Sequence, residues 1–425
     1  MIIEQEVTVY TERKNCRLCA GSFKEVLNLG PIHISTFVDT NDTPSPKVPI
    51  TLVQCVDCGL MQLKHTVNGD AMYSEYWYQS GLNSSMVAAL KDVVDSVKVR
   101  LLHPLTSSDV VVDIGANDGT LLREYDLAPY PFTVAFEPSN LARMGMANVV
   151  VNDYFNAKVY RGLLLGRAKV ITAIAMFYDL EDPHEFVADV QKILDDQGIF
   201  VVQMMDLVSM IRTSDFPNLC HEHLEYYTLE VFKRLMEQHG LRVFDVEYNA
   251  VNGGSLRAYV CHNGANYETS PGVRKAEVVE REYLNQLGDV GEYFKTRVED
   301  VKEKVVSFIR QQNKEGKKIA VFGSSTKGNL ILEYFGLNDT HIDHAAEINP
   351  DKYFKKTVGS NISIIPQEQS LKINVPFYLI LPWGFLDNFI TNLKDYLNNG
   401  GSFIVPLPIP RIIRSVNGEI REEIL

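Results

Sequence analysis

The chain has 425 residues, of which 45% are hydrophobic and 22% are charged, and its formal net charge is −13 at pH 7. This length and composition are typical of a soluble globular protein with two or three domains, and the acidic excess disfavours nucleic-acid binding, which needs clustered Lys and Arg. No apolar run approaches the ~18 residues of a membrane span, so we expect a cytoplasmic monomer or homodimer that binds a small or nucleotide-sized substrate and neither membranes nor nucleic acid.

Four of the six cysteines form two Cys-x-x-Cys pairs, Cys16 with Cys19 and Cys55 with Cys58. Four thiolates in two such pairs suit a tetrahedral structural zinc ion, which needs soft ligands and no open coordination position. A disulfide pair or a redox-active Cys-x-x-Cys is the competing interpretation, and it is disfavoured in a chain without an export signal. We therefore expect residues 1–68 to form a small module in which zinc replaces a large core.

An aromatic segment at residues 73–81 precedes a helix that we predict at 84–100 from its single apolar stripe. The aromatic side chains either pack at a domain junction or line a pocket for a sugar or a nucleobase. Tyr76 and Tyr78 are the candidates for such a pocket.

Residues 110–122, VVVDIGANDGTLL, predict a buried strand, a glycine turn and the start of a helix. The turn departs from Gly-x-Gly-x-x-Gly and lacks the Gly-Lys-Ser/Thr ending of a phosphate loop. Its side-chain acceptors suit a cationic nucleoside such as S-adenosylmethionine (SAM) better than a pyrophosphate, although a dinucleotide loop stays open as an alternative. The candidate cofactor residues of this loop are Asp113, Gly115, Asn117, Asp118 and Gly119.

The strand at 132–136 ends at Glu137, 22 residues after Gly115, where a carboxylate can accept hydrogen bonds from ribose hydroxyls. Further strands are predicted at 148–151, 170–176 and 199–204, with a helix that begins after Asp182 and ends at Gly198. This alternation predicts a parallel, doubly wound sheet whose ligand lies beyond the carboxyl ends of its strands. Asp153 and Phe177 follow two of these ends and complete the candidate cofactor residues.

The segment Cys220-His221-Glu222-His223 follows the fifth predicted strand and is dense in groups that exchange protons near neutrality. We interpret His221, Glu222 and His223 as catalytic. Structural histidines are one alternative. Metal ligation is another, but a third ligand at the usual spacing is missing.

Two substrate contacts are predicted from the next segment, Asn252-Gly-Gly-Ser-Leu-Arg257, which otherwise forms a hairpin turn. Arg257 is placed to hold a phosphate with two hydrogen bonds. The charged stretch 274–315 has apolar residues at helical spacing and predicts a helical segment that links and braces two domains.

The last part of the chain repeats the strand and helix pattern of residues 110–204 in weaker form. Residues 319–323 read as a strand and glycine, and a second strand ends at the acid Glu347. We infer a second Rossmann-like domain, related to the first by duplication. Lys327, in its glycine loop, is a candidate ligand of a substrate pyrophosphate. The predicted divisions are a zinc module at 1–68, a methyltransferase domain at 69–265, a helical linker at 266–315 and a Rossmann-like domain at 316–425.

Taken together, these motifs resemble those of SAM-dependent sugar C-methyltransferases, and the resemblance covers nearly the whole chain. The combination is specific, although each short motif is not. The motifs are the two cysteine pairs ending in Cys55-Val-Asp-Cys58-Gly-Leu, the loop Asp113-Ile-Gly-Ala-Asn-Asp-Gly119, Glu137-Pro-Ser, Glu222-His223, Asn252-Gly-Gly-Ser-Leu-Arg257 and Lys327-Gly-Asn329.

The resemblance implies an α/β fold in which a small zinc module precedes a class I methyltransferase sheet and a second Rossmann-like domain. It also implies methylation of a carbon beside the ketone of a nucleotide-linked keto-deoxysugar, with His223 as base, Glu222 as its neighbour and Tyr76 or Tyr78 nearby. Cys220 and His221 depart from the tyrosine and the acidic residue of the sugar enzymes, which leaves the sugar and the identity of the base open.

This chemistry needs a base with a pKa near 7 and a donor for the enolate oxygen, for which we consider His221 or a tyrosine. One alternative is an O- or N-methyltransferase that acts on a carbohydrate. The other is a noncatalytic protein that binds SAM or a nucleotide.

Overall fold

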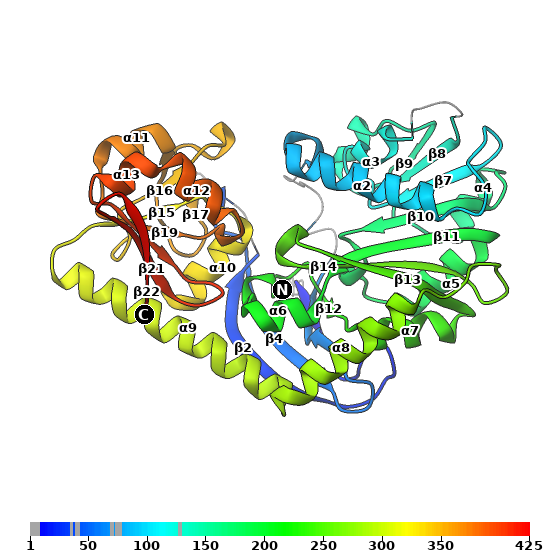
Figure 1. The fold of residues 1–425 in the computed structure, drawn as a ribbon, viewed down its shortest axis with the longest axis horizontal. Coiled ribbons are helices and arrows are strands. Elements are labelled where there is room, and N and C mark those ends of the chain that lie inside the picture. Colours follow the sequence, from blue (N-terminus) through cyan, green and yellow to red (C-terminus); the bar gives the residue numbers. More distant parts are fainter. Residues whose placement is uncertain (1–8, 35–36, 39–42, 69–71, 73–78, 126–129) are drawn as a thin grey trace, which may run out of the picture.

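The computed structural model describes residues 9–34, 37–38, 43–68, 72, 79–125 and 130–425. Figure 1 shows two lobes, one coloured cyan to green and one coloured yellow to red, with the blue N-terminal strands and helices α8 and α9 at their base. Within the described ranges, none of the helices combines the length and the apolar character that a membrane span requires.

The N-terminal module is built mainly on a four-stranded sheet in the order β12-β5-β4-β2. Apolar side chains of the long strands β2 and β4 face inward and are buried. Its outer strand β12, Glu225–Tyr226, comes from much later in the chain, so the module also contains part of the segment that follows His223. The strands of the N-terminal region are β1 Tyr10–Glu12, β2 Phe23–His33, β3 Phe37–Val38, β4 Lys47–Cys55, β5 Met61–Leu63 and β6 His65–Val67.

The central lobe holds a seven-stranded sheet in the order β13-β14-β11-β10-β7-β8-β9. The five strands from β11 to β9 are parallel, which confirms the predicted doubly wound arrangement, whereas β14 and β13 pair antiparallel. The strand order reverses between β7 and β10, and ligands of such sheets bind beyond the strand ends at that point. The strands are β7 Val110–Ile114, β8 Phe132–Phe136, β9 Val149–Val151, β10 Ala168–Ile174, β11 Leu194–Met205, β13 Leu241–Asn249 and β14 Ser255–His262.

Side-chain caps start the helices that flank this sheet. The Asp182 side chain accepts from the Glu185 N–H at 2.9 Å, and Thr228 caps α7 through the Val231 N–H. The predicted helix after Asp182 ends at Ile193, five residues before Gly198, because β11 begins at Leu194. The helices are α2 Ser84–Arg100, α3 Thr120–Arg123, α4 Ala157–Gly162, α5 Pro183–Ile193, α6 Leu207–Thr213 and α7 Leu229–Gln238.

The predicted helical linker consists of two helices, α8 Pro271–Leu287 and α9 Val290–Lys314. Gly288 separates them with a φ of +71°, a left-handed conformation that glycine adopts without strain, and Asp289 caps α9. The buried stripe of α9 includes Phe294, Val298 and Ile309. Figure 1 shows α9 extending along the base of the C-terminal lobe.

The C-terminal lobe has a seven-stranded sheet in the order β18-β16-β15-β19-β20-β21-β22, and its first five strands are parallel. This confirms a second Rossmann-like fold. The order of these five strands matches β9-β8-β7-β10-β11 of the central sheet, which supports duplication. The strands are β15 Ile319–Phe322, β16 Ala345–Glu347, β18 Ile364–Pro366, β19 Phe377–Ile380, β20 Ser402–Val405, β21 Arg411–Val416 and β22 Glu419–Ile424; the helices are α10 Thr326–Phe335, α11 Gln367–Ile373, α12 Leu386–Asn392 and α13 Lys394–Asn398.

Contacts between distant segments cross the four predicted divisions. β17, Lys356–Thr357 of the C-terminal lobe, pairs with β3 of the N-terminal region. The carboxylate of Glu333 on α10 accepts from both the backbone and the ring of His33 at the end of β2. The N-terminal module therefore contacts both lobes, and the division into four segments stays a prediction.

Candidate active site and zinc centre

The two cysteine pairs converge on one point of the N-terminal module. All four sulfur atoms lie within 4.8 Å of one another, with Cys16 Sγ to Cys58 Sγ at 3.6 Å and Cys19 Sγ to Cys55 Sγ at 3.3 Å. A tetrahedral zinc ion with Zn–S bonds of about 2.3 Å places its sulfur ligands about 3.8 Å apart. The cysteines are free rather than joined in disulfides. The donor set and its spacing therefore fit structural zinc.

Arg17, between two of these cysteines, connects the zinc centre to the central lobe. Its fully buried side chain donates to Leu63 O at 2.6 Å and Thr66 Oγ1 at 2.7 Å, and it pairs with Glu181 at 3.2 Å. Glu181 lies in the loop between β10 and α5 and lines the cavity described below. The zinc module thus positions one wall of that cavity.

The glycine loop after β7 is held against Glu137 at the end of β8. The Asn117 N–H donates to Glu137 Oε2 at 2.7 Å, and the Ser139 N–H donates to Oε1 at 2.9 Å. Gly115 has a φ of +70°, and an added Cβ would lie 3.1 Å from the Met176 side chain, so glycine is needed there. Each carboxylate oxygen of Glu137 keeps a lone pair for a ribose hydroxyl. Gly115, Asn117 and Glu137 all line the cavity, and this geometry fits a nucleoside.

Other polar side chains of the loop serve the protein itself. Asn117 Oδ1 accepts from the Ser80 N–H and Asp118 Oδ2 accepts from the Gly81 N–H, so these side chains hold the turn that precedes α2. Asp118 is outside the cavity wall, as is Gly119, whose φ of +77° starts α3. This corrects the expectation that the side-chain acceptors of the loop all face the cofactor.

Three further predicted cofactor contacts are also misplaced. Asp113 is buried behind the loop, where Thr172 Oγ1 donates to it at 2.6 Å and burial raises the pKa of its carboxyl to about 7. Phe177 is fully buried among other aromatic rings, including Phe186 at 5.6 Å between centroids. Asp153 is exposed, and it is the neighbouring residues 154–156 that line the cavity. None of the three lines the cavity.

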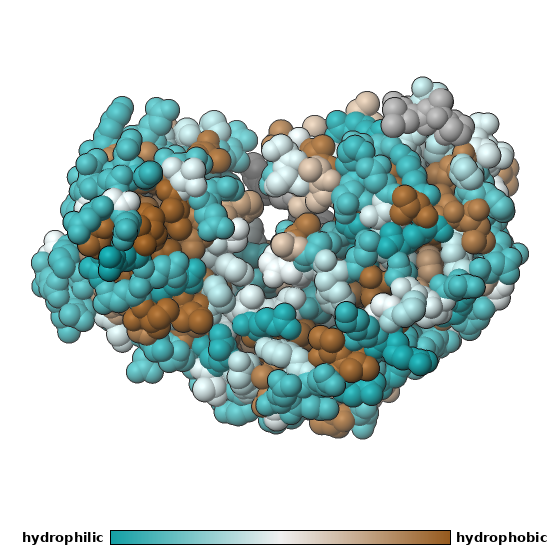
Figure 2. All heavy atoms as spheres, viewed as in Figure 1, coloured by the Kyte–Doolittle hydropathy of each residue, from teal (hydrophilic) through white to brown (hydrophobic). Residues whose placement is uncertain are grey.

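One cavity of about 1190 Å³ runs from the glycine loop to the C-terminal lobe. Figure 2 shows the molecular surface hollowed between the two lobes. A single drug-sized ligand occupies about 300–1,000 Å³, so this cavity has room for a donor and an acceptor together. It is lined by the glycine loop and Glu137 at one end, by His221, Glu222, His223 and Asn252 beside them, and by Thr326 and Lys327 of α10. Tyr76 and Tyr78, predicted to contribute from the first domain, lie outside the described residues.

Asn218 organises the far end of the cavity. Its backbone carbonyl accepts from His223 Nδ1 at 2.9 Å, its side-chain oxygen accepts from Lys327 Nζ, and its side-chain NH₂ donates to Asp215. Because a carbonyl can only accept, Nδ1 carries the proton of the neutral ring and Nε2 keeps its lone pair. The edge of Tyr178 packs on the His223 ring at 4.4 Å between centroids, which fixes its orientation.

Burial shifts the protonation of this cluster. It lowers the pKa of His223 to about 3, with the charge of Lys327 as the second cause. Burial also raises the pKa of the Glu222 carboxyl, which Lys327 opposes, and raises that of Asp179, with Glu222 adding to the shift. The expectation of a base with a pKa near 7 is thus not met in the ligand-free protein. His223 is instead neutral at physiological pH, which is the form that can accept a proton.

His221 does not have the predicted catalytic geometry. Its Nε2–H donates to Val48 O at 3.0 Å, and burial lowers its pKa to about 4. The neutral ring then has no second N–H for an enolate oxygen. His221 lines the cavity but joins the cavity wall to β4 of the N-terminal module.

The fold does bring three possible metal ligands together near His223, although the sequence spacing did not predict a third one. A sulfur, an oxygen and a nitrogen of Cys220, Glu222 and His223 lie within 4.8 Å of one another. The positive charge of the Lys327 ammonium lowers the pKa of all three groups, and the same charge would repel a metal cation at this position. The arrangement therefore favours proton transfer over metal binding.

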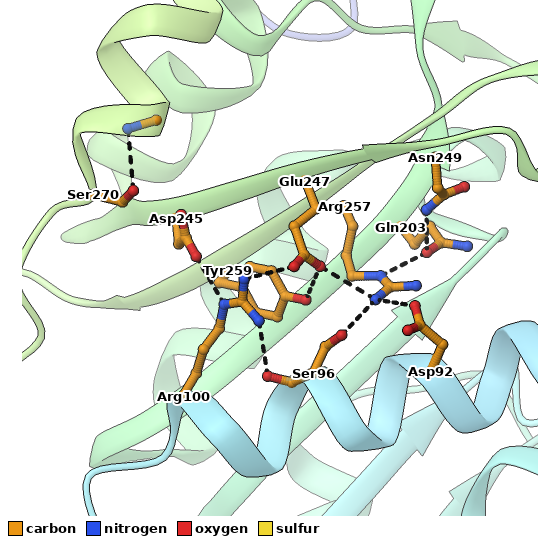
Figure 3. Close-up of polar contacts among 11 residues, drawn as sticks. Asp92, Ser96, Arg100, Gln203, Asp245, Glu247, Asn249, Arg257, Tyr259 and Ser270 are labelled. Carbon is orange, nitrogen blue, oxygen red and sulfur yellow. Dashed lines mark hydrogen bonds and ion pairs between the residues drawn. The ribbon is translucent and has the colours of Figure 1, made fainter.

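Arg257 is not a phosphate ligand in this structure. Figure 3 shows its guanidinium beside α2, where it contacts Asp92, Ser96, Gln203 and Glu247. Arg257 does not line the cavity. The distance from Arg257 Nη1 to Asp92 Oδ2 is 2.9 Å, and the side chain is 2% exposed. The prediction for Arg257 was wrong because its position in β14 directs the side chain toward α2. Asn252, in the preceding turn, does line the cavity.

Sequence reasoning missed Asn218 and Asp179. Each lies two residues from a position that the sequence did single out, Asp179 after Phe177 and Asn218 before Cys220. Asn218 belongs to no recognisable sequence motif. Only its hydrogen bonds to His223 and Lys327 reveal its position between them.

Comparisons with known proteins agree with this three-part arrangement. Family models match a zinc binding domain at residues 16–73, a methyltransferase domain at 86–246 and a C-methyltransferase C-terminal domain at 250–408. The C-methyltransferase NovU of Streptomyces niveus is 31% identical over 411 residues, which cover 94% of this chain and 96% of NovU.

Two solved methyltransferases are similar to parts of the chain. The plantazolicin methyltransferase BpumL, in complex with a triazolic desmethylPZN analog and SAH, is 10% identical, with a TM-score of 0.34 over 43% of this chain and 87% of its own. The plantazolicin methyltransferase BamL, with a triazolic desmethylPZN analog and SAH, is 14% identical, with a TM-score of 0.33 over 42% of this chain and 86% of its own.

Proposed function

The chain belongs to the C-methyltransferase family and is a SAM-dependent enzyme with a zinc-binding module, and from this premise we propose that it methylates the carbon beside the ketone of a nucleotide-linked keto-deoxysugar. Its relation to a C-methyltransferase favours transfer to carbon over transfer to oxygen or nitrogen. The proposal concerns the acceptor and the residues that act on it.

The observation that carries the proposal is the continuity of the cavity. It joins Glu137 and the glycine loop at one end to Glu222, His223 and Lys327 at the other. A carbon acid beside a ketone needs a base, a donor to its oxygen and a methyl donor within one enclosed space. We infer that this cavity brings together the base, the donor to the oxygen and the methyl donor.

At the donor end, Glu137 would hold the ribose. Gly115, which has no side chain, would let the loop backbone lie close to the nucleoside. The wall is acidic, because Asp179, Glu181 and Asp182 also line the cavity, which suits a cationic cosubstrate. Bound SAM supplies an electrophilic methyl group on a sulfonium.

At the acceptor end, His223 would take the proton from the substrate carbon at Nε2. The ring is held for this role by its Nδ1–H bond to Asn218 O and by the edge of Tyr178. Glu222 lies beside it and would stabilise the imidazolium that forms. Cys220, Glu222 and Asn218 would also contact the sugar, so they are the candidates for selecting it.

The function is tested with a panel of nucleotide-linked 4-keto and hydroxy deoxysugars. We expect a methylated product by mass spectrometry for a keto sugar, and exchange of the hydrogen beside its ketone in D₂O without SAM, because only carbon methylation needs the enolate. His223→Asn should abolish both while SAM affinity is retained, and His103→Asn, an exposed histidine outside the cavity wall, is the control. Absence of exchange and methylation across the panel, with SAM bound, would refute the acceptor class; exchange at the wild-type rate in His223→Asn would refute its role as base.

A further inference from the structure

We propose that Lys327, which the C-terminal lobe contributes, is the catalytic residue that stabilises the oxyanion formed when the substrate carbon is deprotonated, and that it does not hold a substrate diphosphate. This role rests on the function proposed above. It gives the C-terminal lobe a direct part in the chemistry.

The hydrogen bonds of Asn218 bring Lys327 to the base. Lys327 Nζ donates to the side-chain oxygen of Asn218, and His223 Nδ1 donates to the backbone oxygen of the same residue. Asn218 is itself 2% exposed and tied to Asp215, so it holds both partners at fixed positions. An ammonium group and an imidazole bound to one small residue can act on neighbouring atoms of one substrate.

The start of α10 holds the backbone of Lys327 in place. Lys327 is the second residue of this helix, and Ser325 caps it by accepting from the Gly328 N–H at 3.0 Å. A Cβ on Gly328 would lie 2.8 Å from Leu381, so the helix begins in close contact with the end of β19. Thr326 and Lys327, the first two residues of the helix, line the cavity, so the partial positive charge of the helix N-terminus lies at the cavity wall.

The charges of the cavity wall argue against a diphosphate at Lys327. Among the described residues that line the cavity, Lys327 is the only Lys or Arg, whereas seven carboxylates line it. Diphosphate groups are usually held by several cationic or amide donors, with arginine favoured for two-point contacts. One ammonium group beside Glu222 and His223 matches a single oxyanion better.

The step is balanced without a further reactant. His223 Nε2 takes the proton from the carbon, the electrons of the C–H bond form the carbon–carbon double bond, and the carbonyl π electrons move to oxygen. Lys327 donates a hydrogen bond to that oxygen. In the free protein, burial and then the charge of Lys327 keep the pKa of His223 low. The oxyanion would neutralise that charge, so the imidazolium becomes more stable as the enolate forms.

The test compares Lys327→Met and Lys327→Arg with the wild type, and Lys394→Met serves as the matched control. Lys394 is an exposed residue of α13 in the same lobe, outside the cavity wall. The measurements are hydrogen exchange of a keto nucleotide sugar in D₂O without SAM, the Kd of the corresponding nucleoside diphosphate alone, and the Kd of SAM. We expect Lys327→Met to slow exchange by about 10²–10³-fold, as loss of an oxyanion donor does, with both affinities unchanged within twofold and partial rescue in Lys327→Arg.

The outcomes separate the two levels of inference. If the wild type exchanges but Lys327→Met exchanges equally fast, the role of Lys327 is refuted and the proposed function stands. If Lys327→Met instead weakens nucleoside diphosphate binding tenfold or more, Lys327 is a diphosphate ligand. If no wild-type exchange occurs with any keto sugar, both are overturned. A thermal unfolding midpoint of Lys327→Met close to those of the wild type and Lys394→Met excludes misfolding as the cause of a loss.

Discussion

Arg17 links the zinc centre to the cavity wall, and its replacement gives a quantitative test of that link. Arg17→Met keeps the aliphatic stem and removes every guanidinium donor. Two acceptors, Gln62 Oε1 and Leu63 O, are buried and receive these donors at 3.2 and 2.6 Å. Hydrogen bonds to a charged group contribute about 1.5–3 kcal/mol each, so we expect a loss of about 3–5 kcal/mol in the free energy of unfolding.

The matched control is Arg13→Met. Arg13 pairs with the same carboxylate, Glu181, but its side chain is 28% exposed, so we expect a loss of at most about 1 kcal/mol. Both variants are compared by urea unfolding at a fixed zinc concentration, and the zinc content is measured so that a lost metal is not mistaken for a lost contact. Equal destabilisation by the two substitutions, at equal zinc content, would contradict the inference that Arg17 is a buried structural contact.

Three further outcomes are expected. Chelation of zinc should abolish methyl transfer and reduce the β-sheet signal in circular dichroism, and added Zn²⁺ should restore both; full activity in zinc-free protein would contradict this. Burial raises the pKa of Glu225 to about 8 from the usual 4.5, so its protonated form stabilises the fold at low pH and this contribution is lost as pH rises through 8. Glu225→Gln, which keeps the neutral shape, should therefore gain stability relative to the wild type between pH 4.5 and 8, by up to about 1.4 kcal/mol per pH unit, and a pH-independent difference would refute the assignment. Arg257→Met should lower the thermal midpoint but leave the Kd values of SAM and the nucleotide unchanged, and a weakened nucleotide affinity would restore its predicted role.

Local patterns were enough to predict the parts of the fold that depend on neighbours in sequence. The helix at 84–100 was predicted at its observed bounds because its apolar stripe is local, and the structure adds a side-chain cap from Asn83. The two cysteine pairs and the glycine loop with Glu137 were also predictable, since each needs a set of residue types at fixed spacing.

Side-chain direction was not predictable in the same way. Arg257 and Phe177 were predicted at the cavity, but one faces α2 and the other the aromatic core. A strand presents alternate residues to opposite faces, so the choice of face depends on strand pairing, and β14 pairs antiparallel between β11 and β13.

The meeting of His223 with Lys327 depends on tertiary structure alone. Lys327 and its partner Asn218 are 109 residues apart, and nothing in either segment specifies the other. The sequence suggested a pyrophosphate ligand because a lysine and the amides of a loop at a helix start can together hold an anion. The structure instead directs this lysine across the cavity toward the other lobe.

The pairing of β12 with β5 limits which segments can be exchanged between related proteins to make chimaeras. Two residues after His223, the chain becomes the outer strand of the N-terminal sheet, and the Leu63 N–H donates to Leu224 O at 2.8 Å. A chimaera that exchanged residues 1–68 with those of a relative would replace the partner of that strand and thereby move the segment carrying the base. The zinc module and the segment that carries His223 must therefore be exchanged together, although more than 150 residues separate them in the chain.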